Sequence, residues 1–173
     1  MKIIKTYIKD LALIRSPVFS DNRGFFKEVD KQNILRKRFI FDCFSFSKKN
    51  TLRGLHLQKK KNKEKIITVV QGKILDVVVD LRNKSKTYGK HFAIEISQNS
   101  NFSLFIPENF AHGFLCLSKN CGVYYKCTNY RDKNSETTIK WNDKKLDIRW
   151  PIKKPILSKK DKMGLTFEEF IKS

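Results

Sequence analysis

The feature that most constrains the fold is a series of short apolar segments. Turn residues separate these segments at regular intervals. These segments, rich in β-branched and aromatic residues, are Lys65–Val70, Lys73–Leu81, His91–Ile96, Phe102–Ile106, Gly113–Leu117 and Val123–Tyr130. Segments of this length and spacing are typical of strands in an all-β barrel or sandwich. Because only a short turn at Gln71-Gly72 separates the first two segments, we expect them to form a hairpin.

Helices play a small part in the predicted fold. Asp30–Arg38 is compatible with one short helix, and Thr166–Lys172 predicts a second, with Thr166 as its N-cap and Glu169 at the third position. No repeat or linker divides the chain, and 173 residues provide one core more readily than two. We therefore expect a single domain over residues 1–173.

The formal net charge of +20 requires an explanation. A basic chain can bind nucleic acid, or it can attract small anionic ligands over a long range. The basic residues are mostly Lys and are spread along the whole chain, and the densest run, Lys59–Lys63, lies between two apolar segments. We therefore favour a compositional bias combined with an anionic small ligand over a nucleic-acid partner.

The chain has four cysteines, Cys43, Cys116, Cys121 and Cys127. They form no C-x-x-C pair and no metal-ligand spacing, which favours free thiols in a reducing compartment. The segment Met1–Ile14 is interrupted by charged residues and so does not resemble a signal peptide. No stretch approaches the roughly 18 apolar residues of a membrane span. We expect a cytoplasmic protein.

Residues that can carry chemistry gather in three clusters, Asp21–Glu28, Leu52–Gln58 and Pro107–Phe114. His56 lies between Leu55 and Leu57, so in a strand the two leucines face one way and His56 faces the other. His56 and His112 both lie in glycine-punctuated, strand-like segments, which favours a functional pair over two structural histidines. His91 precedes a plain strand and is interpreted as structural.

The spacing of these residues resembles a cupin metal site with two ligands replaced. A cupin would place ligands as H-x-H, then Glu, then a later His. His56 and His112 occupy the first and last positions, but the second His is Gln58 and the Glu is Lys65. An ammonium beside a divalent cation is electrostatically unfavourable. The sequence therefore predicts a site without a metal.

A cationic pocket with a histidine base suits the removal of a proton next to a carbonyl. Such a carbon acid is very weak, and a cation that meets the developing enolate oxygen lowers the barrier. Lys65 is a candidate for that role. Epimerisation also needs a proton donor on the opposite face of the carbon, and Tyr125 is a candidate phenolic acid. These residues alone do not name the substrate.

Five motifs in order resemble the dTDP-4-dehydrorhamnose 3,5-epimerase family, over about residues 19–161. The motifs are L-R-G-L-H-x-Q, V-V-x-G-x-x-x-D-V-x-V-D-L-R, I-P-E-x-F-A-H-G-F, Y-K-C-T-x-Y and W-x-D. The resemblance implies a cupin-like, double-stranded β-helix fold. It also implies an isomerase that needs no cofactor, works in polysaccharide sugar biosynthesis, and forms a homodimer in which strands are exchanged between barrels.

The resemblance also implies four catalytic roles. His56 is the general base that takes the proton from C3 or C5 of the sugar, and Asp161 pairs with it. Lys65 stabilises the enolate oxygen at C4, and Tyr125 is the acid on the other face. Without the resemblance, Asp161 reads as a surface charge. A strand-edge lysine at Lys65 and a core aromatic residue at Tyr125 are the less favoured structural alternatives.

The resemblance further implies residues that contact the sugar nucleotide. They are Phe19, Arg23, Glu28, Arg53 and His112, and the two arginines would bind the diphosphate as bidentate forks. Arg53 and His56 are three residues apart, which would place them on opposite faces of a regular strand. We expect a local bulge at Gly54 to bring both inward.

The chain departs from the family in the segment before L-R-G-L-H. The family usually has Q-x-N-x-S there, whereas this chain has Cys43-Phe44-Ser45-Phe46-Ser47, followed by a loop about two residues short. Cys43 and Ser45 thus replace a Gln and an Asn that line the pocket. The smaller side chains lead to the hypothesis of a modified substrate, a GDP-linked 4-keto-6-deoxy-heptose.

Several alternatives remain open from the sequence. The nucleotide could be dTDP, GDP or CDP, and the enzyme could invert C3 and C5 or C3 alone, with double inversion favoured. A 3,4-ketoisomerase on the same scaffold is a second enzyme class, and the retained Lys65 and Tyr125 argue against it. A basic polyanion-binding protein is the non-enzymatic alternative, and the chain lacks a recognised nucleic-acid-binding motif.

Overall fold

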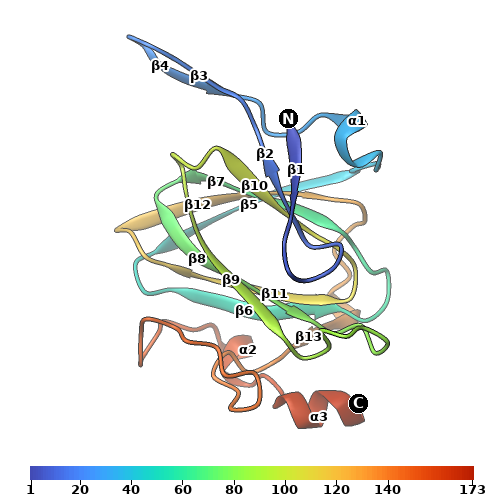
Figure 1. Cartoon of the computed structure of the whole chain (residues 1–173). Coiled ribbons are helices and arrows are strands. Elements are labelled where there is room, and N and C mark those ends of the chain that lie inside the picture. The colour runs from blue at the N-terminus through green and yellow to red at the C-terminus, as the bar shows by residue number, and fades with distance from the viewer.

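The computed structural model describes residues 1–173, and two antiparallel sheets that face each other dominate it (Figure 1). One sheet has six strands, in the order β1 (Lys2–Lys5), β2 (Ala12–Arg15), β10 (Phe102–Ile106), β7 (Lys65–Gln71), β12 (Asn120–Cys127) and β5 (Phe41–Lys48). The other has five strands, in the order β13 (Glu136–Thr138), β6 (Leu52–Gln58), β11 (Phe110–Cys116), β8 (Lys73–Asp80) and β9 (His91–Ser97). The all-β prediction is confirmed.

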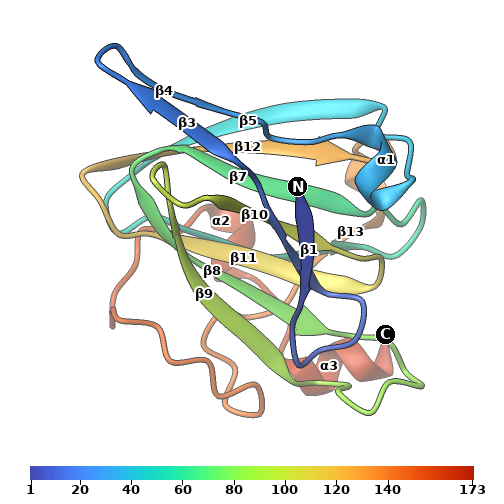
Figure 2. The same ribbon diagram turned by 45° about the horizontal axis from the view of Figure 1, so that its top comes forward.

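The remaining elements lie outside the two sheets. Strands β3 (Val18–Asp21) and β4 (Gly24–Lys27) form a hairpin that projects away from the barrel, as both ribbon views show (Figure 2). The helical elements are α1 (Gln32–Leu35), the 3-10 turn η1 (Lys133–Ser135), α2 (Lys159–Lys162) and α3 (Phe167–Lys172). Helix α3 begins with the expected capping box between Thr166 and Glu169, and none of the helices is long and apolar enough to cross a membrane.

Strand β8 of the five-stranded sheet is covered on both faces, which explains its continuous apolar run. Ile74 and Val78 point into the main core between the two sheets. Val77 and Val79 point the other way and pack with Phe167 of helix α3 in a second core. Side chains alternate along a strand, so a strand with two covered faces needs apolar residues at successive positions.

The expected hairpin between Lys65–Val70 and Lys73–Leu81 is wrong. Both segments are strands, but β7 pairs with β10 and β12 in one sheet, whereas β8 pairs with β9 and β11 in the other. Gly72, at φ +71°, carries the chain from one sheet to the opposite one. A tight turn can join two strands of one hairpin or carry the chain to the opposite sheet. Long-range pairing decides the outcome here, because β7 and β8 each have partner strands on both edges.

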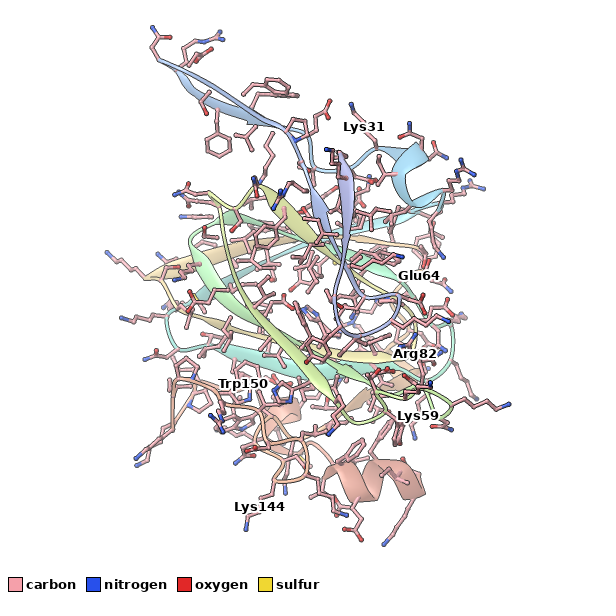
Figure 3. All side chains as sticks on the ribbon, in the orientation of Figure 1. Lys31, Lys59, Glu64, Arg82, Lys144 and Trp150 are labelled. Carbon is pink, nitrogen blue, oxygen red and sulfur yellow. The ribbon has the colours of Figure 1, made fainter.

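The lysines are distributed over the surface. Lys31, Lys59 and Lys144 lie at widely separated places on the molecule (Figure 3). This distribution agrees with the sequence-based preference for a general compositional bias over one basic nucleic-acid-binding patch.

Candidate active site

A cavity of about 740 Å³ opens between the two sheets. Its walls come from β5, β7 and β12 of the six-stranded sheet and from β6 and β11 of the five-stranded sheet, and the segment around helix α2 closes one side. The sequence-predicted residues that line it are His56, Tyr125, Lys65, Asp161, Arg53, His112, Cys43 and Ser45. The fold thus brings together eight of the predicted residues from six separate segments.

His56 and Asp161 form a close hydrogen-bonded pair in the cavity. His56 Nε2 lies 2.5 Å from Asp161 Oδ1. Ser158 is the N-cap of helix α2, where its hydroxyl accepts from the Asp161 backbone N–H and donates to Asp161 Oδ2 at 2.8 Å. Burial opposes ionisation of Asp161, but its hydrogen bonds with His56 and Ser158 and from the Gly54 backbone lower its pKa. The cap therefore holds a charged carboxylate against one ring nitrogen and fixes the ring.

His112 also has a carboxylate partner, which the sequence did not reveal. His112 Nε2 lies 3.0 Å from each carboxylate oxygen of Asp76, and both residues are buried. Desolvation lowers the pKa of His112. The sequence did contain one signal for this contact, because Asp76 lies inside the apolar run of β8 and a buried charge needs a partner.

Lys65 lies on β7, on the opposite wall from His56. Desolvation lowers the pKa of its ammonium group to about 8, although the negative charge of Asp76 favours the protonated form. A buried ammonium is a strong electrostatic partner for an anion that develops nearby, because little water screens it.

Tyr125 projects from β12 of the six-stranded sheet. Its hydroxyl lies 3.2 Å from the Ser45 hydroxyl, and its ring makes an edge contact with His112 at 6.4 Å between centroids. Burial raises the pKa of the phenol, so Tyr125 is protonated at neutral pH. His56 and Tyr125 thus face one cavity from different sheets.

The predicted bulge at Gly54 is confirmed. The register between β6 and β11 shifts between His112, opposite His56, and Phe114, opposite Arg53. Gly54 has φ +129°, and a Cβ there would lie 2.5 Å from the Gly113 Cα. The shift lets Arg53 and His56 line the same cavity despite their spacing of three. Arg53 is held by Ser47 Oγ, which accepts from its Nε at 2.9 Å, and by the Phe46 carbonyl, which accepts from its Nη2 at 3.0 Å.

Three predicted substrate contacts are not brought to the cavity of their own chain. Phe19 lies on β3 and is 60% exposed, and Arg23 lies at the hairpin turn, where it pairs with Asp21. Glu28 follows β4 and pairs with Lys31 at 2.9 Å. The hairpin that carries or precedes them departs from the barrel of its own chain, so their contact with substrate stays a prediction.

A further charged group at the cavity was not predicted. Arg131 and Lys160 each donate to Glu136 at 2.7 Å, and both cations lower the pKa of that carboxyl to about 2. All three side chains line the cavity, as does Lys63. These residues come from loops, from the short strand β13 and from the one-turn helix α2, where the sequence shows no periodic pattern. No group of three or more His, Cys, Asp or Glu side chains is arranged to hold a metal ion.

Comparison with known proteins identifies the family of this chain. A family model for dTDP-4-dehydrorhamnose 3,5-epimerase matches residues 5–169. The chain belongs to the dTDP-4-dehydrorhamnose 3,5-epimerase family. The epimerase of that name from Shigella flexneri is 40% identical, over 96% of each chain. The Neisseria gonorrhoeae relative is 41% identical over the whole of this chain, which spans 55% of that relative's length.

Solved structures of the dTDP-4-dehydrorhamnose 3,5-epimerase family share the fold. The Legionella pneumophila dTDP-6-deoxy-D-glucose-3,5-epimerase, in complex with dTDP-4-keto-L-rhamnose, has a TM-score of 0.92 and 37% identity, covering 96% of this chain and 93% of its own. The Bacillus anthracis enzyme with TDP and PPi bound has a TM-score of 0.92 and 38% identity, covering 96% and 99%. The expected cupin-like fold and the expected enzyme class, a carbohydrate isomerase, are confirmed.

Proposed function

We propose that the protein inverts C3 and C5 of a dTDP-linked 4-keto-6-deoxysugar. The observation that carries the proposal is the pairing of His56 with Asp161 on one wall of a cavity that Tyr125 and Lys65 line from the other sheet. Inversion at a carbon next to a ketone needs a base on one face, an acid on the other and a cation at the ketone oxygen. These four side chains supply that set.

His56 is the proposed base. Its Nε2 is bound to Asp161, so Nδ1 is the nitrogen left to take a proton from the sugar. The Asp161 carboxylate stabilises the imidazolium that forms. The His56 side chain is 36% exposed, so a bound sugar can reach it.

Lys65 and Tyr125 complete the proposed reaction. The Lys65 ammonium stabilises the negative charge that develops on the C4 oxygen after proton removal. Tyr125 then donates its phenolic proton to the carbon from the opposite face, which inverts the centre. The Ser45 hydroxyl, 3.2 Å away, orients the phenol and can stabilise the phenolate.

The cationic lining supports a diphosphate ligand. Arg53, Lys63 and Arg131 line the cavity, and arginine forks suit phosphate oxygens. The relatives and solved structures compared with this chain are named for dTDP-linked sugars. They give no support to the sequence-based hypothesis of a GDP-linked heptose, and we therefore propose dTDP as the nucleotide. Cys43 and Ser45 remain proposed sugar contacts at the cavity wall.

The proposal includes a homodimer. Phe19, Phe25 and Phe26 are each more than half exposed on the β3–β4 hairpin, at 60%, 54% and 65%. A projecting apolar hairpin is a candidate protein interface. In a dimer with exchanged hairpins, Phe19 and Arg23 would reach the cavity of the partner subunit, where they would act as the substrate contacts that the sequence predicted.

The test is proton NMR in D₂O with dTDP-4-keto-6-deoxyglucose, followed at the C3 and C5 proton signals. GDP- and CDP-linked hexoses and heptoses form the comparison panel. Loss of both signals, fastest with the dTDP-hexose, is the expected result. Loss at C3 alone would replace double inversion by single inversion, and movement of the ketone would indicate the ketoisomerase. No exchange with any panel member would refute the epimerase proposal and favour the polyanion-binding alternative.

A further inference from the structure

Two cysteines lie side by side on the inner face of the six-stranded sheet. Cys43 on β5 is paired in register with Tyr125 on β12, and Cys127 lies two residues further along β12. Because side chains alternate along a strand, Cys43, Tyr125 and Cys127 point to the same face. Both cysteines line the cavity. A thiol pair is therefore part of the wall of the candidate active site.

The two thiols are diagonal neighbours on paired strands but have unequal surroundings. The Cys127 thiol donates a hydrogen bond to the Cys43 sulfur, and this bond, assisted by Lys63 and Lys65, lowers the pKa of Cys43 to about 7. The same bond and burial raise the pKa of Cys127. Cys43 is exposed, whereas Cys127 is buried. An exposed thiol of lowered pKa beside cations, with a second thiol on the neighbouring strand, is the arrangement of a peroxide-reactive cysteine.

Cys116 and Cys121 provide an internal comparison. Both are buried in the main core, and burial raises the pKa of Cys121. Thiols of this kind are protonated and inaccessible, so they react slowly. The chain thus contains two pairs of cysteines, of which one lines the cavity and the other is enclosed in the core.

We propose that Cys43 and Cys127 form a peroxide-reactive pair that closes to a disulfide and switches off the site. The Cys43 thiolate attacks one oxygen of a hydroperoxide, an S–O bond forms, and the O–O bond breaks to release hydroxide or alkoxide. The Cys127 sulfur then attacks the Cys43 sulfenic acid, the S–S bond forms, and the departing hydroxide leaves as water with the Cys127 proton. Two thiols are oxidised and one peroxide is reduced.

Closure requires a shift of one strand and would take place beside the reacting groups. Diagonal neighbours on paired strands have Cα atoms about 7–8 Å apart, and a disulfide needs a shorter separation, of at most about 7 Å. Strand β5 is the edge of its sheet and pairs only with β12, so the required shift toward Cys127 would disturb no other strand pair of β5. Such movement would displace Ser45 from the Tyr125 hydroxyl. Lys65 lies directly opposite Cys127 on β7, so the bond would form beside both groups.

The experiment treats the reduced full-length protein with hydrogen peroxide and measures intact mass, a disulfide peptide map and epimerase activity. We expect the mass to fall by two hydrogen atoms, the map to join Cys43 to Cys127, and activity to be lost and then restored by dithiothreitol. A map that joins Cys116 to Cys121, or four unmodified thiols after treatment, would overturn the proposal.

Three variants separate the roles, each compared with its own untreated sample. Cys127→Ser should stop at the sulfenic acid, seen as a gain of one oxygen atom that dimedone traps. Cys43→Ser should show neither change. Cys121→Ala is the matched control from the enclosed pair and should still form the Cys43–Cys127 bond. Retained disulfide chemistry in Cys43→Ser would contradict the assignment of Cys43 as the attacking thiol.

This inference rests on the proposed function only for its activity readout. Mass and peptide mapping report the thiol chemistry whether or not the protein is an epimerase. Disulfide formation without any measurable epimerase activity in the untreated protein would support the thiol pair and refute the function. Full epimerase activity in a fully disulfide-bonded sample would support the function and overturn the switch.

Discussion

The two cavity histidines differ in exposure, although each is paired with a carboxylate. The His56 side chain is 36% exposed, whereas that of His112 is 6% exposed and contacts both oxygens of Asp76. A base that reacts with a sugar carbon must be reached by the substrate. The exposure therefore favours His56 as the base and leaves His112 as a rigid part of the lining.

His56→Ala is expected to abolish most turnover while the fold is retained. Loss of a positioned general base typically costs about 10²–10⁴-fold in rate. Exchange at C3 and C5 in D₂O measures the loss, and circular dichroism checks the fold. His91→Ala, at the histidine whose Nδ1 contacts the Leu146 carbonyl outside the cavity, is the matched control. Full activity in His56→Ala would refute its assignment as the base.

Tyr125→Phe is expected to impair inversion more than proton exchange. The variant keeps the aromatic ring but loses the hydroxyl that lies 3.2 Å from Ser45, so the base can still remove a proton that cannot be returned from the opposite face. NMR of the substrate in D₂O separates loss of the proton signal from formation of the inverted product. Equal loss of both rates would contradict the acid role, and so would full inversion.

The lowered pKa of Lys65 predicts that epimerase activity depends on pH. The proposed role needs the ammonium form, and burial lowers its pKa to about 8. The charged form of Lys65 therefore dominates below about pH 8 and is lost above it. The value of kcat/KM should therefore fall as pH rises through this range.

The Lys65 variants test that assignment. Lys65→Met should abolish exchange at both carbons, while Lys61→Met, in the loop outside the cavity lining, should not. Lys65→Arg keeps a charge that does not titrate in this range, so any activity left should lack the high-pH decrease. An unchanged decrease in Lys65→Arg would assign it to another group.

At the level of elements, the bulge at Gly54 decides which side chains of strand β6 line the cavity. A regular strand would point Arg53 and His56 to opposite faces, and the shift against β11 brings both to the cavity. Glycine is required for two reasons, because φ is +129° and because a Cβ at this position would lie only 2.5 Å from the Gly113 Cα. A single backbone irregularity thus assembles part of the site.

Gly54→Ala should destabilise the protein more than Gly24→Ala. Both glycines have positive φ, and strain of that kind costs about 1–3 kcal/mol. At Gly24, φ is +134° but nothing lies within 4 Å of an added Cβ, so only the strain applies. Thermal unfolding of the two variants measures the difference. A Tm for Gly54→Ala equal to that of Gly24→Ala would show that the β6–β11 contact adjusts freely.

In the molecule as a whole, the β3–β4 hairpin projects apolar side chains that its own barrel does not cover. It is joined to the barrel at its base, where Lys27 Nζ donates to the Ser100 carbonyl at 3.0 Å, and its phenyl rings are exposed. A second copy of the chain is the proposed cover for these rings.

Phe19→Ser with Phe26→Ser should shift the protein from dimer to monomer. The two rings pack on each other at 6.4 Å between centroids and carry much of the exposed apolar surface of the hairpin. Sedimentation velocity measures the change, and Val70→Ser, exposed at the end of β7, is the matched control. A monomeric unaltered protein would contradict the dimer proposal.

The sequence by itself determined the all-β fold class, the C-terminal capping box, the bulge and the eight cavity residues. It could do so because alternation, capping and glycine placement act over a few neighbouring residues, and because the motifs are specific to one family. Only the tertiary structure decided that β7 and β8 belong to opposite sheets, that Asp76 holds His112, and that Phe19, Arg23 and Glu28 lie away from their own cavity. These outcomes depend on pairings between distant segments, which local residue patterns do not encode.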